Sequence, residues 1–221
     1  MIRKVIIKLA LLFSCCIGPL QGNHFYSEYW QKFFWKMWEN DTFALGTYIK
    51  IDTGNQFKSV RSFQFNEELL WKVSENFSLE LHYAYIHGRT IEPKSPWLWQ
   101  YRFELEANRT FRLPHDCLIV TRNRLEIRWV KTEHKTLYRL RQRTTLVIPL
   151  EDMGRLKSYS LHNEIFYNVS IRYFTQNRFC PFQLTFALSD TLEMDLFFLL
   201  RICHTNNLWL KSAVLGTQFS F

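Results

Sequence analysis

The strict alternation of apolar and charged residues from Leu118 to Ile148 limits what this chain can fold into more than any other feature. In the first half, LIVTRNRLEIRWV, the residues Leu125, Ile127 and Trp129 share one parity and the arginines share the other, and RLRQRTTLVI in the second half repeats the pattern. Successive side chains of a strand point to opposite faces, whereas a helix would scatter these residues around its circumference. We therefore predict a hairpin of two long strands, with one apolar, aromatic face and one densely charged face.

Similar period-two runs follow one another along the chain, separated by short turns. Ten strands are predicted, over residues 44–52, 60–71, 77–85, 97–106, 118–130, 138–148, 159–167, 172–189, 192–203 and 208–221. The aromatic segment 24–38 adds one or two more, with an interfacial or periplasmic helix as the alternative. Because bacterial single-chain barrels usually have an even number of strands, we predict twelve strands, with ten as the alternative. In the eighth run Arg178 and Phe182 share a parity although they should face opposite ways, so we also predict a β-bulge at Cys180-Pro181.

The apolar faces of these strands have no predicted helix to cover them, and no run reaches the roughly 18 apolar residues of a spanning helix. The predicted fold is all-β: an antiparallel transmembrane β-barrel over residues 23–221, polar inside and apolar outside, in contact with outer-membrane lipid. A secreted soluble carrier of the lipocalin type would invert every face, but the arginine density and the aromatic strand ends favour lipid outside. The predicted lipid face includes Leu79, Leu81, Tyr83, Phe103, Leu125, Ile127, Leu140, Leu146, Phe186 and Leu196.

The N-terminus, MIRKVIIKLALLFSCCIGPLQG, combines a basic segment with an apolar segment that is too short and broken to span a membrane. We predict that residues 1–22 form a signal peptide that is removed, and that the mature chain reaches the outer membrane of a Gram-negative bacterium. Lipidation at Cys15 is the weaker alternative, because the bulky Phe13 makes a poor lipobox.

Composition argues against several classes of function. Residues 1–22 hold three basic and no acidic residues, so the 28 Lys and Arg and 20 Asp and Glu of the whole chain leave a mild excess of five positive charges after their removal. The arginines alternate with apolar residues, unlike a nucleic-acid-binding patch. No histidine or cysteine has metal-ligand spacing, and we expect no metal or cofactor. For Cys117, Cys180 and Cys203, one disulfide plus a free thiol is the alternative to three small residues packed in or near strands, which we favour.

The charged faces of the predicted strands supply the candidate site. One interpretation is an anion-selective or substrate-binding lumen, because arginine grips phosphate and carboxylate in a bidentate manner. The other is a salt-bridge lattice that fills a small barrel with its own side chains, in a structural protein or narrow pore. When Glu80, Glu193 and Asp195 are counted with the glutamates of the cluster, seven acidic residues nearly match eight arginines on the predicted inward face, which favours the lattice over an anion or small-solute porin. The candidate lumen cluster comprises Arg102, Glu104, Glu106, Arg122, Arg124, Glu126, Arg128, Arg139, Arg141, Arg143, Glu164 and Arg178.

An outer-membrane lipid hydrolase is the enzymatic alternative, and it would need a serine nucleophile, a histidine base and an orienting partner. Ser160 and His162 share a parity, with Asn163 beside them. Residues two apart on one strand face are about 7 Å apart, however, and a lipid-facing His162 would be costly. We therefore expect no enzymatic activity.

Four short motifs follow one another in the second half of the chain: RNRLEIR at 122–128, RLRQR at 139–143, NEIF at 163–166 and QNR at 176–178. With them the chain resembles the domain of unknown function family 2490, uncharacterised bacterial outer-membrane proteins, most clearly from Trp97 to Phe221. The resemblance implies a barrel and an outer-membrane location, but no reaction or ligand. Phe219 and the terminal Phe221 match the ending that the barrel-assembly machinery reads. The bulky, Gly-poor last third departs from the family and leaves strand boundaries there open.

Overall fold

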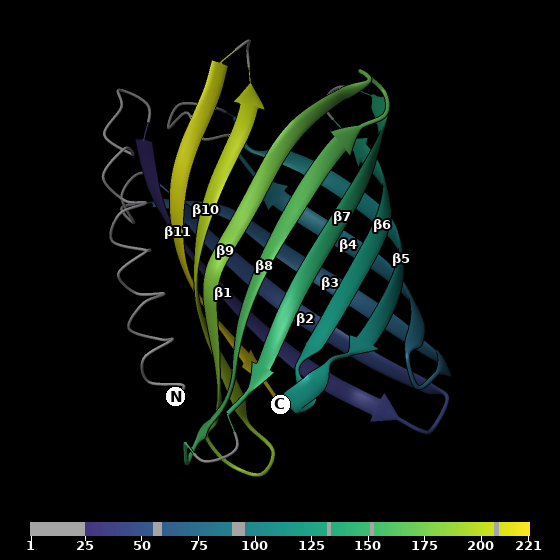
Figure 1. Cartoon of the computed structure of the whole chain (residues 1–221). Helices are drawn as coiled ribbons and strands as arrows, with labels where there is room; N and C mark the ends of the chain where they lie inside the picture. The colour runs from purple at the N-terminus through teal and green to yellow at the C-terminus, as the bar shows by residue number, and fades with distance from the viewer. Residues whose placement is uncertain (1–24, 55–58, 90–95, 132–133, 151–152, 206–207) are drawn as a thin grey trace.

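A computed structural model describes residues 25–54, 59–89, 96–131, 134–150, 153–205 and 208–221. Eleven strands form one closed barrel, and every strand pairs with its neighbours in the chain (Figure 1). The strands are β1 (Phe25–Glu39), β2 (Phe43–Gly54), β3 (Ser59–Ser74), β4 (Phe77–Gly88), β5 (Leu98–Arg112), β6 (Leu118–Val130), β7 (Lys135–Pro149), β8 (Leu156–Asn168), β9 (Tyr173–Ala187), β10 (Glu193–Thr205) and β11 (Leu208–Ser220), with a short 3-10 helix η2 (Pro114–Asp116) before β6. The predicted signal segment 1–22 lies outside the described residues.

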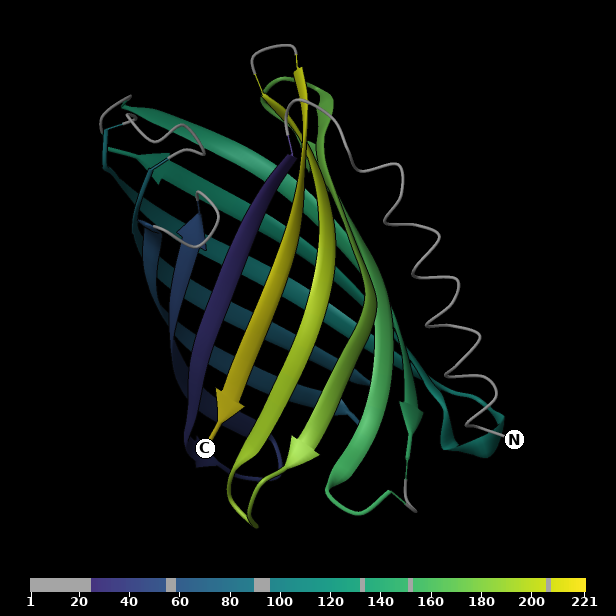
Figure 2. The same ribbon diagram turned by 90° about the vertical axis from the view of Figure 1, so that its left-hand side faces the viewer.

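The barrel closes between its first and last strands, which run parallel from Phe25↔Lys211 to Phe34↔Ser220. Figure 2 shows this seam, with purple β1 beside yellow β11. The predictions of twelve or ten strands and of a wholly antiparallel barrel are therefore wrong for the described residues. The aromatic N-terminal segment forms one long strand, β1, and not a helix or two strands. Eleven strands joined by hairpins leave the first and last pointing the same way, and a parallel ladder satisfies their backbone groups as well.

The bulge predicted at Cys180-Pro181 is confirmed. Phe198 of β10 pairs with Phe182 of β9 and Leu200 pairs with Phe179, so that two residues of β9 lie opposite Leu199 alone. Proline has no N–H to donate to a neighbouring strand, and the bulge leaves Pro181 out of the hydrogen-bonded pairing with β10. The bulge also lets the side chain of Arg178 point inward and that of Phe182 point outward.

The two faces of the barrel differ sharply in polarity. On the outside, large apolar side chains are about half exposed, for example Phe63 (46%) and Leu140 (46%). The ten residues predicted for the outer face all have the parity opposite to that of cavity-lining residues on their strands, such as Glu80, Glu104, Arg124, Arg141, Gln183 and Asp195. Inside, Glu126 and Glu164 are fully buried. Among the described residues, no helix has the length and hydropathy needed to cross a bilayer.

A small apolar cluster occupies part of the interior near the seam. Trp30, Cys180, Leu199 and Val214 are buried together, and Phe197 packs against them. The ring of Phe197 lies directly over Gly216, its cross-strand partner in β11, where a Cβ atom would overlap the ring. Glycine is therefore required at this position by close approach, since the aromatic ring covers the space that a side chain would occupy.

Candidate functional site in the barrel interior

The pairing register of β5 to β8 places like charges directly opposite one another. Arg124 faces Arg141 across β6 and β7, and Glu104 faces Glu126 across β5 and β6. Directly opposed like charges destabilise a sheet, so these side chains need partners on diagonal positions. The geometry of the barrel provides them, because the inward side chains of several strands converge on the same space.

Glu164 of β8 is the centre of this network, and its side chain is fully buried. Its Oε1 atom lies 2.7 Å from Arg122 Nη2 and 2.8 Å from Arg141 Nη2. Its Oε2 atom lies 3.3 Å from Arg143 Nη2 and 3.6 Å from Arg178 Nη1. One carboxylate thus compensates four guanidinium groups from β6, β7 and β9. Two of these arginines, Arg122 and Arg178, are 56 residues apart in the chain.

Three more carboxylates, from β5 and β6, complete the lattice. Their ion pairs at 3.5 Å or less are Arg139–Glu126 at 2.5 Å, Arg141–Glu126 at 2.5 Å, Arg124–Glu106 at 2.5 Å, Arg122–Glu106 at 3.5 Å and Arg124–Glu104. Several of these groups contact two partners, so the pairs form a connected network and not isolated bridges. In such a network the removal of one charged side chain leaves its partners buried without a compensating charge.

A buried aromatic ring supports the arginines from one side. The guanidinium carbons of Arg139, Arg141 and Arg178 lie 4.9, 4.7 and 4.6 Å from the centroid of the Phe166 ring, which is fully buried. Cations over an aromatic face are attracted by the ring quadrupole. Phe166 therefore positions three arginines of the lattice without adding a negative charge.

A second ionic cluster, which the sequence analysis did not single out, lies near the seam. Glu28 of β1 is 1% exposed, receives Trp30 Nε1 at 3.1 Å, lies 2.9 Å from Arg61 Nη1 and pairs with Arg201 of β10. Lys50 Nζ lies 3.9 Å above the Trp30 ring. Extending the alternation of segment 24–38 backwards would have indicated an inward Glu28, but nothing in the sequence indicated its partners.

The interior contains a cavity of about 750 Å³, bounded by residues from all the strands. Thirteen Lys and Arg side chains and five carboxylates line it, and four further buried carboxylates lie close behind: Glu28, Glu106, Glu126 and Glu164. Among the described residues the interior therefore has an excess of about four positive charges. The sequence-based estimate of near balance missed this excess because it omitted five cations, Lys32, Lys50, Arg61, Arg89 and Arg201, against only three acidic residues, Glu28, Asp52 and Glu68, and because it counted Glu193, which does not line the cavity.

Two of the predicted cluster residues lie at the edge of the lattice. Arg102 and Arg128 are directly paired across β5 and β6. Arg102 Nε donates to Gln100 Oε1 at 2.9 Å and reaches Glu104 only at 4.0 Å, and Arg128 donates to the same Gln100 oxygen at 3.4 Å. Within the described part of the chain, Arg128 has no ion pair. These two guanidinium groups are therefore less compensated than the arginines at the centre of the lattice.

The residues considered for hydrolysis lie inside the barrel. Ser160 and His162 are both buried, and His162 Nε2 has no hydrogen-bond partner among the described groups. The two side chains are not joined by a hydrogen bond in the described structure, so they lack the nucleophile–base contact of a hydrolase. Cys117, Cys180 and Cys203 are free thiols in the described structure.

The two C-terminal phenylalanines pack on the seam. The Phe219 ring stacks on Phe33 with centroids 5.6 Å apart, and the Phe221 ring stacks on Trp35 at 5.7 Å. The backbone of Phe221 also exchanges hydrogen bonds with β1, to Phe34 O and from Lys36 N. These residues thus help to join the last strand to the first, whatever else recognises them.

The sequence model of the family described as Protein of unknown function (DUF2490) matches residues 27–209, nearly the whole barrel. The chain belongs to this family. The resemblance inferred from the RNRLEIR, RLRQR, NEIF and QNR motifs is thereby confirmed, and these motifs supply most of the arginines of the lattice together with Glu164. No curated protein matches the chain. The family description assigns no activity, so function has to be argued from the barrel itself.

Proposed function

We propose that this protein is an integral outer-membrane β-barrel whose interior is held by an Arg/Glu salt-bridge lattice. The observation that carries the proposal is the polarity of the two faces: large apolar side chains point outward, uncovered, while carboxylates and guanidinium groups are buried inside. A closed barrel satisfies all of its backbone hydrogen bonds within the sheet, which the hydrocarbon core of a membrane requires. Strands of 12 to 16 residues exceed the roughly 9–11 needed to cross a bilayer when tilted.

A soluble carrier of the lipocalin type fits these faces poorly. Such a protein would bury its apolar side chains around a ligand and present charges to water. Here Leu105, Leu140 and Tyr83 are each nearly half exposed, whereas Glu104 and Glu126 are buried. Soluble monomers rarely expose apolar patches larger than a few hundred Å². An apolar band around the barrel therefore supports lipid, and not water, as the surrounding solvent.

The lattice supports a structural barrel or a narrow pore in preference to a wide channel. Small barrels are commonly filled by their own side chains, and here Glu164, Glu126 and their arginines cross the interior from strand to strand. The cavity of about 750 Å³ is left beside them. We expect water and small ions to enter this space, but no large solute.

Fractionation and electrophoresis test the proposal directly. The protein should be recovered with outer membranes, and its unheated band should migrate differently from the boiled band, as expected of a stable barrel that resists detergent. Recovery in the soluble periplasmic fraction, with no change of mobility on heating, would refute the proposal.

A second candidate function, an anion-preferring pore, is favoured by one specific observation, the excess of about four positive charges in the described interior. The test is the reversal potential of the protein in planar bilayers under asymmetric salt. If Arg128→Ala, which removes a guanidinium group without an ion pair, abolishes an anion preference while heat-modifiability is unchanged, the pore function is supported. If the wild-type protein gives no conductance, the structural function is supported.

A further inference from the structure

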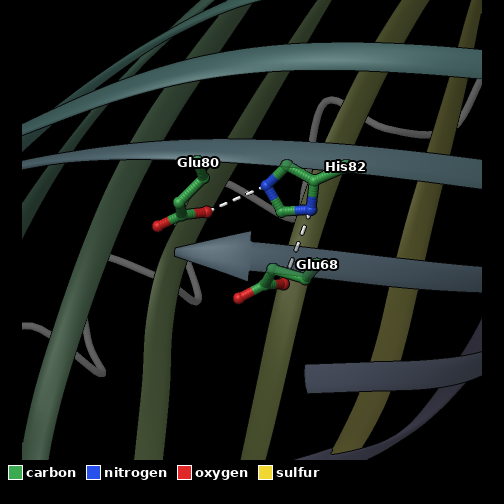
Figure 3. Close-up of side chains that lie close together, drawn as sticks. All are labelled: Glu68, Glu80 and His82. Carbon is green, nitrogen blue, oxygen red and sulfur yellow. Dashed lines mark hydrogen bonds and ion pairs between the residues drawn. The ribbon is translucent and has the colours of Figure 1, made fainter. Parts of the chain in front are cut away.

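His82 of β4 is a buried histidine in the barrel interior with one ring nitrogen that has no hydrogen-bond partner. The residue is 2% exposed, and its Nδ1 atom makes no hydrogen bond. Figure 3 shows the ring between Glu80, on the same strand, and Glu68 of β3, and Nδ1 lies 3.5 Å from Glu68 Oε2. A buried polar atom without a partner is costly, so this nitrogen calls for an explanation.

Glu80 determines which nitrogen of the ring carries the proton. His82 Nε2 lies 2.9 Å from Glu80 Oε2, and the other oxygen of Glu80 accepts a hydrogen bond from Asn108 Nδ2 at 2.7 Å. When Glu80 is ionised it can only accept, and Nε2 is then the donor to Glu80. In a neutral imidazole this leaves a lone pair on Nδ1, which faces a carboxylate oxygen of Glu68. Two acceptors then face each other with no proton between them.

We propose that His82 Nδ1 and the Glu68 carboxylate bind a divalent transition-metal ion of the Zn²⁺ type, with Glu80 as the positioning residue that orients the imidazole. Two ligand atoms that are each about 2.1 Å from a tetrahedral zinc ion lie about 3.4 Å apart, close to the 3.5 Å between Nδ1 and Glu68 Oε2. Imidazole together with carboxylate suits zinc, whereas calcium prefers oxygen ligands alone.

The surroundings of the three residues are compatible with such a site. Potential ligand atoms of Glu68, Glu80 and His82 all lie within 4.8 Å of one another. A metal-binding histidine usually donates its second N–H to a carboxylate, which is the contact that Glu80 makes. All three residues line the interior cavity, so an ion can reach them and water can complete the coordination. The excess positive charge of the cavity opposes a cation, and we therefore expect weaker binding than at a closed four-ligand site.

Isothermal titration of ZnCl₂ into the tag-free, metal-stripped protein, folded in detergent, tests the proposal. We expect one Zn²⁺ per chain, bound more weakly than at a closed four-ligand site, that excess Ca²⁺ does not displace. His82→Gln and Glu68→Gln should each weaken this binding by at least about tenfold, and Glu80→Gln by about 10–100-fold, as for other outer partners of metal-bound histidines. His162→Gln is the matched control, because it removes another buried, cavity-lining histidine and should leave the binding unchanged.

The ¹⁵N chemical shifts of His82 provide a second measurement that does not depend on affinity. The metal-free protein should show a neutral ring protonated at Nε2, zinc should shift the Nδ1 signal, and Glu80→Gln should disturb the tautomer before any metal is added. A doubly protonated His82 clamped between Glu68 and Glu80, with no zinc binding, would overturn the proposal. So would zinc binding that survives His82→Gln, or equal binding of Ca²⁺. The test needs only the folded barrel, so its outcome is independent of the proposed location in the outer membrane.

Discussion

The substitution Glu164→Gln provides the sharpest test of the salt-bridge lattice. It keeps the shape of the side chain and removes a negative charge that Arg122, Arg141, Arg143 and Arg178 share. Arg122 and Arg141 keep other partners, since they also contact Glu106 and Glu126. Arg143 and Arg178 have no other ion pair in the described structure, so both become uncompensated charges.

The expected loss of stability follows from this difference between the four arginines. Removing one partner of a buried ion pair costs about 3–5 kcal/mol, because the other charge is left buried. Arg143 and Arg178 line the cavity, where water can solvate them in part. We therefore expect the free energy of unfolding to fall by about 3 kcal/mol, the lower end of that range, even though two arginines lose their partner.

Reversible urea unfolding of the protein in detergent micelles or lipid vesicles, followed by the unheated band on gels, measures this loss. Glu193→Gln is the matched control, because its pair with Lys157 is about half exposed on both sides and should contribute less than about 1 kcal/mol. If Glu164→Gln lowers the free energy of unfolding no more than Glu193→Gln does, the interior ion pairs do not stabilise the barrel. The lattice would then have to be regarded as a ligand-binding surface.

Three further predictions concern the outer face, the seam and the N-terminus. Leu125→Arg or Ile127→Arg, on the outer face of β6, should each lower the free energy of unfolding in lipid by about 2–4 kcal/mol. Trp129→Arg, near the end of the strand, should lower it less. Normal stability of the first two variants in vesicles would show that this face does not contact lipid. Gly216→Ala should force the Phe197 ring aside and cost about 1–3 kcal/mol in urea unfolding, whereas Gly54→Ala, whose added Cβ would meet only the Arg61 side chain at 3.5 Å, should be nearly neutral. Mass spectrometry of the protein purified from membranes should show a chain that lacks residues 1–22, and an intact Met1 would contradict the signal-peptide prediction.

Period-two alternation was sufficient to predict the strands and the direction of their side chains. It placed Arg124, Glu126 and Leu125 on their correct faces. A strand has only two faces, so the face of one residue determines the face of every other residue in the same strand. The bulge at Cys180-Pro181 could also be predicted, since a break in parity beside a proline is typical of an extra residue in the strand. The strand count was wrong because, with ten runs and one or two more expected in segment 24–38, a rule about even numbers decided in favour of twelve.

Alternation cannot show which strands meet across the barrel or which pairs their side chains form. Register within the Leu118–Ile148 hairpin set Arg124 opposite Arg141, but the partners that make this arrangement stable, Glu106 and Glu164, come from β5 and β8. The contact between His82 and Glu68 was missed for the same reason, because the two residues are 14 positions apart on different strands and match no short motif. Spacing rules describe metal sites on helices and loops far better than sites assembled across a sheet.

The seam connects barrel closure to the charged interior. Arg201 of β10 and Glu28 of β1 are 173 residues apart, and they meet only when β1 and β11 pair. Until then, Glu28 and Arg201 lack each other as partners, and the Phe219 and Phe221 rings lack their contacts on Phe33 and Trp35. Closure therefore forms an ion pair inside the barrel and aromatic stacks outside it in the same step. Parallel pairing at the seam is slightly less stable per residue than antiparallel pairing. The paired charges and stacked rings on its two faces provide a stabilisation that the backbone ladder alone does not.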